Sequence, residues 1–360
     1  MVHVIPSLGP GGAERVVTSL SLAQRRAGYD VGVLTQRART SERRALLDGG
    51  VDLIEWGGTS RAALMARSGA WLARSRSSLA SLDVLHVHLT FGIAFGAVTR
   101  ILQALGPARR PVVIETDHST GMDVSTKTRI LYQMTSWRTD AVVSVMRGVA
   151  PARRTSSQTL RATIPNGIDP LPMRSSWEAG NPLRLGSLGL LRPDRHPERY
   201  LELVRELTRY VDVTFTYGGD GSCRDSLARQ AMSLGLSHNI RFAGLITDRE
   251  QFFTSIDAHV SIAVGDDVGI ASLEAASTAT PSFAQQIVPG GRCPDFPVPT
   301  RTTVAELAAA IGDLATTPDL RMDLGTQQAA YVRTERSVDQ MVASYADVYA
   351  ACLRRKSTRR

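Results

Sequence analysis

The sequence predicts an α/β protein with two tandem, doubly wound parallel-sheet domains of the Rossmann-like type that face an interdomain cleft. Three observations support this fold class. At 360 residues, the chain is longer than a single core comfortably accommodates. Short apolar runs alternate with helix-periodic stretches, which is typical of parallel sheets covered on both faces. The alternation stops at a connector near 170–182 that contains Pro, Gly and Ser, and then it starts again.

Near-continuous apolar runs mark the predicted strands, and most of them are separated by helical stretches. In the first domain the expected strands are 2–8, 30–36, 51–56, 83–88, 111–116, 141–146 and 162–165. In the second domain they are 183–191, 212–219, 239–245, 258–264 and 281–287, with connecting helices near 197–210, 222–235 and 248–256.

These elements divide the chain into three parts. We assign 1–172 to an N-terminal domain and 173–334 to a second domain. The remaining stretch, 335–360, reads as an amphipathic helix with a basic tail, and we expect it to pack back on the N-terminal domain.

The composition indicates a soluble globular protein, with 43% hydrophobic and 21% charged residues. No apolar stretch reaches the roughly 18–20 residues of a membrane-spanning helix, and the N-terminus lacks the organisation of a signal peptide. Cys223, Cys293 and Cys352 are scattered without CxxC spacing. We read them as free thiols of a reducing compartment, which favours the cytoplasm.

Positive charge is concentrated in the first half of the chain. Residues 1–170 contain 21 Lys and Arg against 12 Asp and Glu, and the remainder is close to neutral. An anionic membrane surface or a phosphate-bearing substrate would suit this charge, but so would an ordinary Arg-rich surface. Nucleic acid is disfavoured because the basic residues show no aromatic interleaving.

Ligands of open parallel sheets bind at the carboxyl ends of the strands, so the loops after strands are the first place to look for a site. Gly9, Gly11 and Gly12 follow the first strand and precede a helix. Free amides there could hold a phosphate or a sugar hydroxyl, although such turns are also common structural devices. The spacing is not GxGxxG and no acid ends the second strand, so a nicotinamide cofactor is disfavoured.

His86, His88 and His118 are the candidate histidines of the first domain. His118 lies in a polar loop after the strand 111–116, where it could reach a ligand or could be an ordinary hydrogen-bonded residue. His86 and His88 alternate along one strand and share a face, but no third residue is spaced to complete a metal site. We interpret this pair as packing or hydrogen-bonding residues.

The loops of the second domain contain basic, Gly-rich and acidic segments. Arg192 and Arg195 precede a helix and could clamp a diphosphate, or could be a surface pair. A Gly-rich turn occupies 217–221. In the segment 266–275, DDVGIASLEA, the amides of Gly269 and Ile270 begin a helix that carries Glu274, and Asp266 precedes them.

In order along the chain, these motifs resemble the retaining glycosyltransferases of family 4, which have the two-domain GT-B fold. The matching segments are GGAERV, IPNGID, GLLRPDRHP, YGGDG, NIRFAGLITD and DDVGIASLEA, and they extend over nearly the whole chain. The last corresponds to the family's pair of acids spaced eight residues apart.

The resemblance implies a role for each candidate residue. The N-terminal domain would bind the acceptor and the second domain a nucleotide-sugar donor, with Gly11 and Gly12 approaching its phosphates. His118 would hydrogen-bond the transferred sugar near the reacting carbon, and Asp266 would contact sugar hydroxyls. The remaining donor contacts would come from Arg192, Arg195, the amides of Gly269 and Ile270, and Glu274, which would hold the ribose. Neither a metal nor another cofactor is expected, because the nucleotide sugar is the co-substrate.

Three residues depart from the family pattern. Leu190 stands where the family has Arg, and Arg195 stands where it has Lys. Asp266 replaces the first Glu of the acidic pair and is one methylene shorter. We expect these changes to alter which sugar is accepted or to lower the activity.

The sequence therefore predicts a retaining, metal-independent, hexosyltransferase-type enzyme of bacterial surface glycan biosynthesis. Its acceptor would be a polysaccharide or a lipid-linked oligosaccharide, and it would be cytoplasmic and peripheral on the inner face of the plasma membrane. A non-catalytic nucleotide-sugar-binding partner of the same fold and a GT-B nucleotide-sugar epimerase are the alternatives.

Overall fold

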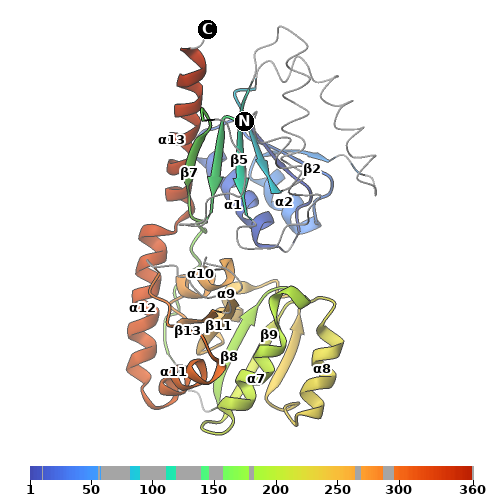
Figure 1. Ribbon diagram of the computed structural model, residues 1–360, viewed down its shortest axis with the longest axis vertical. Coiled ribbons are helices and arrows are strands. Elements are labelled where there is room, and N and C mark those ends of the chain that lie inside the picture. Colours follow the sequence, from blue (N-terminus) through green and yellow to red (C-terminus); the bar gives the residue numbers. More distant parts are fainter. Residues whose placement is uncertain are drawn as a thin grey trace. The chain divides into compact units, whose positions relative to one another are not determined.

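The structure is a computed structural model and describes residues 1–9, 11–55, 57, 82–89, 111–118, 139–145, 157–177, 182–263, 269–286 and 296–358. The chain divides into two compact units (Figure 1). Unit 1 comprises Met1–Gly167 and Val338–Arg360, and unit 2 comprises Ile168–Ser337. Both are α/β units with parallel sheets, which confirms the predicted fold class.

The sheet of unit 1 has the strand order β3-β2-β1-β4-β5-β6-β7, and every pair is parallel. Its strands are β1 (Val2–Ile5), β2 (Gly32–Thr35), β3 (Asp52–Glu55), β4 (Val84–His88), β5 (Val112–Asp117), β6 (Ala141–Ser144) and β7 (Leu160–Thr163). The order reverses between β1 and β4, and this reversal is where doubly wound sheets place their ligands.

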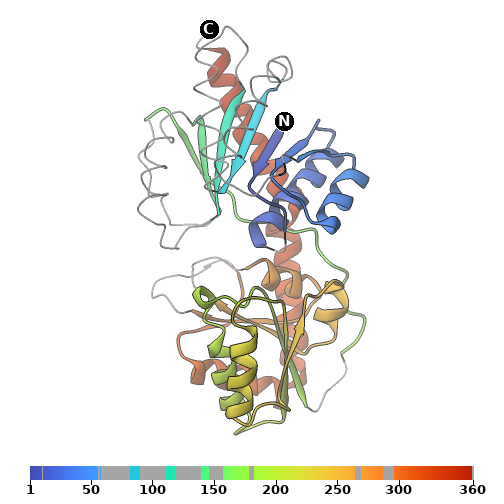
Figure 2. The ribbon, with the colours of Figure 1, turned by 90° about the vertical axis from the view of Figure 1, so that its right-hand side faces the viewer.

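Three helices of unit 1 are described: α1 (Gly12–Arg26), α2 (Thr40–Asp48) and α13 (Val338–Ser357). The helix α13 runs along one face of the sheet (Figure 2) and contacts β5, β7 and α1. Its buried side chains recur every three or four residues, as an amphipathic helix requires, and they are Val338, Met341, Val342, Tyr345, Val348, Tyr349 and Cys352. The last described helix therefore supplies part of the core of unit 1.

The sheet of unit 2 has the order β10-β9-β8-β11-β12-β13, which reverses between β8 and β11. Its strands are β8 (Leu183–Leu188), β9 (Val213–Gly218), β10 (Ile240–Gly244), β11 (Ala258–Ala263), β12 (Ser282–Gln286) and β13 (Thr300–Arg301). The two-residue β13 was not predicted from the sequence, because so short a strand has no periodicity to recognise.

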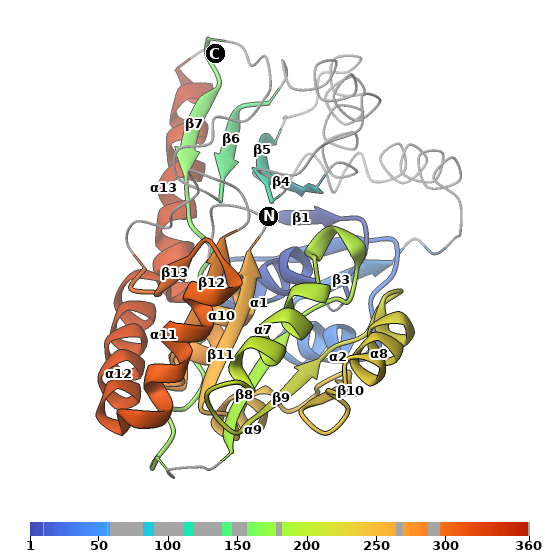
Figure 3. The same cartoon turned by 60° about the horizontal axis from the view of Figure 1, so that its bottom comes forward.

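Helices cover both faces of this sheet. The helices α7 (Glu198–Leu207), α8 (Arg224–Ser233) and α11 (Val304–Thr316) pack into one apolar cluster with the strands (Figure 3). Phe252 and Phe253 of α9 (Arg249–Thr254) and Ala275 of α10 (Ile270–Ser277) form a second cluster. The long α12 (Pro318–Glu335) packs against α10. No helix in the described ranges is both long enough and apolar enough to cross a membrane.

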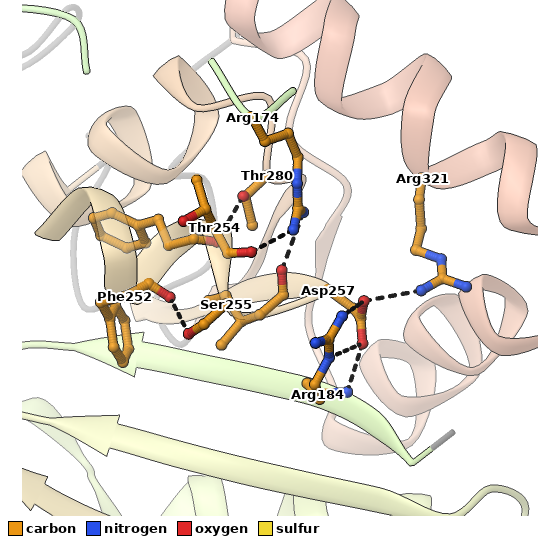
Figure 4. Close-up of polar contacts among 10 residues, drawn as sticks. Arg174, Arg184, Phe252, Thr254, Ser255, Asp257, Thr280 and Arg321 are labelled. Carbon is orange, nitrogen blue, oxygen red and sulfur yellow. Dashed lines mark hydrogen bonds and ion pairs between the residues drawn. The ribbon is translucent and has the colours of Figure 1, made fainter. Parts of the chain in front are cut away.

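A buried carboxylate fastens the start of unit 2. Asp257 is fully buried between α9 and β11 and accepts hydrogen bonds from the amide and the guanidinium of Arg184 at 2.8–3.2 Å. The Oδ1 atom, which also accepts from Arg184, is 3.0 Å from a guanidinium nitrogen of Arg321 on α12 (Figure 4). One carboxylate thus joins the first strand of unit 2 to the helix α12, which is distant in sequence.

The connector segment 168–177 is held by the end of α9. The guanidinium of Arg174 donates to the carbonyl oxygens of Thr254 and Ile256 at 2.5 and 3.1 Å (Figure 4). It also lies 3.7 Å over the ring of Trp177. A cation is stabilised at this position because the last carbonyls of a helix have no acceptor role within it.

The variant Asp257→Ala should lower the free energy of unfolding by about 3–5 kcal/mol, because it leaves the guanidiniums of Arg184 and Arg321 without their shared carboxylate in a buried site. Urea denaturation measures this loss. The matched control is Asp313→Ala on α11, an exposed carboxylate whose removal should change stability by less than about 0.5 kcal/mol. Equal losses in the two variants would contradict the structural role of Asp257.

Candidate functional site

A cluster of histidines occupies the strand-order reversal of unit 1. His3 on β1 is the register partner of His86 on β4, and His88 follows two residues later on the same face. All three side chains are fully buried. His118 lies directly after β5 and completes a set of four imidazoles that meet near the carboxyl ends of the central strands.

One line of hydrogen bonds runs through three of these rings to α1. The Nε2 atom of His118 is 3.0 Å from Nδ1 of His88. The Nε2 atom of His88 is 3.0 Å from Nδ1 of His3, and Nε2 of His3 is 2.6 Å from the side-chain oxygen of Gln24. This line uses every ring nitrogen of His3 and His88, and it leaves Nδ1 of His118 buried without a partner among the described residues.

A second line continues from Gln24 to α13. The side-chain nitrogen of Gln24 donates to the hydroxyl of Tyr349 at 3.2 Å, and that hydroxyl is 2.7 Å from Nδ1 of His86. The Nε2 atom of His86 is 2.7 Å from the hydroxyl of Thr116, which is 2.9 Å from the hydroxyl of Tyr345. Two tyrosines of the last helix therefore close a polar network inside the sheet.

The prediction that no third residue joins His86 and His88 is wrong, because β1 lies beside β4 and brings His3 to them. Possible ligand atoms of the three histidines lie within 4.8 Å of one another, so these residues could hold a metal ion. Each of their ring nitrogens already has a side-chain hydrogen-bond partner. A metal would bind only after several of these bonds were broken, so the residues fit a hydrogen-bonded core better.

Burial keeps these imidazoles neutral. It lowers the pKa of His3 and of His118 to about 4. Burial, with the neighbouring imidazoles as a smaller cause, holds the pKa of His86 and of His88 well below the usual value. Near neutral pH each ring therefore has one N–H donor and one nitrogen acceptor.

The predicted glycine loop of unit 1 begins a helix. Gly11 is the N-cap of α1 and makes no side-chain cap, and Gly12 is the first helical residue. A Cβ atom on Gly11 would overlap the carboxylate of Glu14, which folds back against the helix start. Burial raises the pKa of Glu14. Gly11 thus leaves room for this carboxylate at the start of the helix.

In unit 2, two loops cross closely at the carboxyl ends of β8 and β9. Gly219 has a φ of 133°, and a Cβ atom there would overlap the carbonyl oxygen of Gly189. The amide of Gly189 donates to Gly218, and the amide of Leu191 donates to Asp220. The Gly-rich turn predicted at 217–221 therefore allows one backbone to pass directly over the other.

A short 3-10 helix, η2 (Pro193–Arg195), follows β8, with Arg192 as its N-cap and Arg195 as its last residue. The guanidinium of Arg192 is bonded to the carboxylate of Asp194 at 2.7 and 2.9 Å, and this pair is exposed. Both arginines lie at the strand-order reversal of unit 2, beside the loops described above. The pair with Asp194 was not predicted, and it partly neutralises Arg192.

The helix α10 follows β11 at the same edge of the sheet. Gly269 is its N-cap without a side-chain cap, and a Cβ atom built on Gly269 would meet no described atom within 4 Å. No residue in the described ranges accepts from the amides of Ile270 and Ala271. Glu274, one turn further on, is buried and forms an ion pair with Arg249 of α9. Asp266 and its neighbour Asp267 lie outside the described residues.

Sequence reasoning did not find the residues that hold these side chains. Gln24, Tyr345 and Tyr349 carry no motif, and Gln24 and Tyr349 are 325 residues apart. The ion pair of Arg249 with Glu274 spans two helices and has no local spacing signal. His3 could have been found only with the strand order in hand.

Two family models match the chain. Glycosyltransferase Family 4 matches residues 10–170, and Glycosyl transferases group 1 matches residues 183–317. Together they extend over most of unit 1 and much of unit 2. No curated protein sequence matches the chain.

Solved structures with the same fold include enzymes of sugar transfer. HepE of Anabaena, in complex with UDP and glucose, has a TM-score of 0.79 and 15% identity over 97% of this chain and 98% of its own. Sucrose-phosphate synthase of Thermosynechococcus elongatus has a TM-score of 0.73 and 15% identity over 97% and 98%. WaaG, a glycosyltransferase involved in lipopolysaccharide biosynthesis, has a TM-score of 0.68 and 15% identity over 97% and 99%.

The free energy of unfolding should fall as the pH drops from about 6.5 toward 4. The unfolded chain binds protons on its histidines near pH 6.5, whereas the folded chain binds them on His3 and His118 only near pH 4. The free energy of unfolding therefore has its full value above pH 6.5. Below that pH, each such histidine lowers the free energy of unfolding by up to about 1.4 kcal/mol per pH unit. Urea midpoints measured at pH 7.5, 6.5 and 5.5 check this slope. A constant midpoint over this range would show that the cluster is not buried and neutral.

Proposed function

Because this chain is a glycosyltransferase of the GT-B fold, with a Glycosyltransferase Family 4 part and a Glycosyl transferases group 1 part, we propose that it transfers a sugar from a nucleoside diphosphate sugar to a glycan or lipid-linked acceptor. The transfer would retain the anomeric configuration. Unit 2 would bind the donor, and unit 1 would bind the acceptor and contact the transferred sugar.

The observation that carries the proposal is the start of α10. The amides of Ile270 and Ala271 are unpaired among the described residues, and the helix dipole adds positive potential at the same place. A diphosphate suits this arrangement. Glu274 lies one turn behind and is paired with Arg249, and in this proposal its carboxylate would accept hydrogen bonds from ribose hydroxyls.

Uridine is the base to test first. The HepE structure is a complex with UDP and glucose, and it shares the fold over nearly the whole length of both chains. Bound UDP in that protein supports a uridine diphosphate sugar as the donor here, with guanosine as the competing choice.

The chemistry follows from charge that develops on the leaving diphosphate as the glycosidic bond breaks. Backbone amides at α10 and the guanidiniums of Arg192 and Arg195 would stabilise this charge, so the proposed reaction needs no metal ion. The acceptor hydroxyl would attack from the face that the diphosphate leaves, without a protein nucleophile. We propose that His118 and Asp266 contact hydroxyls of the transferred sugar.

The variant Glu274→Gln should weaken UDP binding about 10- to 100-fold, because a hydrogen bond to a charged group contributes about 1.5–3 kcal/mol. Calorimetric titration with UDP and GDP measures this loss and identifies the base. The control is Glu250→Gln, an exposed acid on α9 beside Arg249, which should bind UDP like the natural chain.

The variant His118→Ala separates donor binding, measured by the same titration, from transfer, measured as consumption of the donor sugar. It should bind UDP normally but consume the donor sugar more slowly, because His118 belongs to unit 1. Full activity in both Glu274→Gln and His118→Ala would refute the assigned site. UDP binding without sugar consumption, even with an acceptor, would instead indicate a non-catalytic binding partner.

We further propose that the acceptor belongs to a bacterial surface glycan and is reached at the inner face of the plasma membrane. The role of WaaG in lipopolysaccharide biosynthesis supports this choice. In unit 1, Leu47 on α2 is 52% exposed, and the exposed Arg44 lies one turn before it. An apolar side chain next to a cation is suited to an anionic lipid surface.

The variant Leu47→Glu should weaken binding to vesicles of anionic lipid at least about tenfold, because a buried leucine contributes about 1.5–3 kcal/mol and the new charge is repelled. Co-sedimentation with phosphatidylglycerol vesicles at low salt measures the affinity. Leu245→Glu in unit 2, where the leucine is 58% exposed, is the matched control and should bind normally. A natural chain that ignores such vesicles would refute the membrane proposal.

A further inference from the structure

His118 contains a buried polar atom that the protein itself does not use. Its Nδ1 atom has no hydrogen-bond partner among the described residues, whereas its Nε2 atom is bonded to His88. A buried polar atom without a partner is costly, so a ligand group or a water molecule is expected to pair with it. The chemistry of that group depends on whether Nδ1 carries a proton.

The hydrogen-bonded line determines this. A neutral imidazole has one N–H and one acceptor nitrogen, so a proton placed on one nitrogen excludes a proton on the other. In the line from His118 through His88 to His3, each bond joins a ring nitrogen to the next ring. If the last ring donates outward, every ring before it must donate in the same direction.

Gln24 sets that direction. Its side-chain oxygen is 2.6 Å from Nε2 of His3, so His3 carries its proton on Nε2 and accepts on Nδ1. His88 then donates from Nε2 to His3 and accepts on Nδ1, and His118 donates from Nε2 to His88. The Nδ1 atom of His118 is consequently left as a lone pair.

The Gln24 amide also belongs to the second line of hydrogen bonds. The side-chain nitrogen of Gln24 donates to the hydroxyl of Tyr349. That hydroxyl can then donate a hydrogen bond to Nδ1 of His86, and Nε2 of His86 donates to the hydroxyl of Thr116. Turning the amide over would reverse every one of these bonds together. The two lines therefore share one polarity, with Gln24 at their junction.

We propose that Gln24, held by Tyr349, acts through His3 and His88 to keep His118 in the Nε2–H tautomer, so that His118 presents a hydrogen-bond acceptor to its ligand. Gln24, Tyr349, His3 and His88 are then positioning residues. The ligand group at Nδ1 must be a donor, which a sugar hydroxyl is and a phosphate oxygen is not. This assignment of the ligand group rests on the proposed function, whereas the tautomer itself does not.

The tautomer can be read directly in the full-length protein labelled with ¹⁵N-histidine. Long-range ¹H–¹⁵N correlation spectra at pH 7.5 distinguish a protonated ring nitrogen from an unprotonated one, and loss of a signal in His118→Asn assigns it among the seven histidines. The natural chain should show His118 with a protonated Nε2 and an unprotonated Nδ1. A protonated Nδ1 would overturn the proposal without any variant.

Two substitutions at Gln24 test the anchor. Gln24→Met keeps the volume but removes the acceptor, so His118 should lose its single tautomer and show a mixture. Gln24→Glu keeps an acceptor for His3 and should retain the Nε2–H tautomer. Persistence of the natural tautomer in Gln24→Met would overturn the role of Gln24.

Two tyrosines on α13 form a matched pair of controls. Tyr349→Phe removes the hydroxyl that orients Gln24 and should produce the same mixture as Gln24→Met. Tyr345→Phe removes a buried hydroxyl that contacts only Thr116 in the network and should leave the His118 signal unchanged. Identical spectra for the two variants would overturn the proposed path through Tyr349.

Transfer activity, measured in the same variants, separates this inference from the proposed function. If both hold, Gln24→Met and Tyr349→Phe should consume the donor sugar about tenfold more slowly, and Gln24→Glu and Tyr345→Phe should not. A mixed tautomer with an unchanged rate would support the positioning line and refute the contact of His118 with the sugar.

Discussion

The structure of unit 1 depends on the pairing of polar groups that the sheet buries at its strand-order reversal. Parallel strands bring the side chains of His3, His86 and His88 together where water does not reach. Unpaired, each would cost about 1–3 kcal/mol, which is a large share of the marginal stability of a protein. Gln24, Thr116, Tyr349 and His118 remove that cost, because together with the His3–His88 bond they give each ring nitrogen of the three a partner. The position of α13 on the sheet is thus tied to the histidines beneath it.

In unit 2 the buried polar groups are carboxylates, and ion pairs with arginines stabilise them. Asp257 satisfies guanidiniums from a strand and a distant helix, and Glu274 is paired with Arg249 although both belong to separate helices. In each case a buried carboxylate is stabilised by an arginine, whose planar donors suit it. The helix α10 is therefore fixed both by apolar packing and by an ion pair. Its N-terminus is held in place before any ligand binds.

Most of the fold could be predicted from the sequence, because hydrophobic periodicity is a local property. The alternation of apolar runs and helical stretches located the strands of both sheets, apart from β13, which has only two residues. The glycines of 217–221 and the start of α10 also carry local signals. The network around His118 does not, because Gln24 and Tyr349 meet only after the chain has folded. The partner of Glu274 has no spacing signal for the same reason, and Asp266 falls outside the described part of the chain.

The return of α13 to unit 1 has a consequence for synthesis on the ribosome. Unit 2 is continuous in sequence and can complete its core as soon as its own residues have emerged. Unit 1 is translated first, yet His86 and Thr116 gain their partners Tyr349 and Tyr345 only after α13 has been synthesised, so the earliest part of the chain is completed last. A nascent chain that stopped before α13 would have an intact second half and a first half with exposed apolar strands. Such a chain would be a substrate for chaperones and proteases.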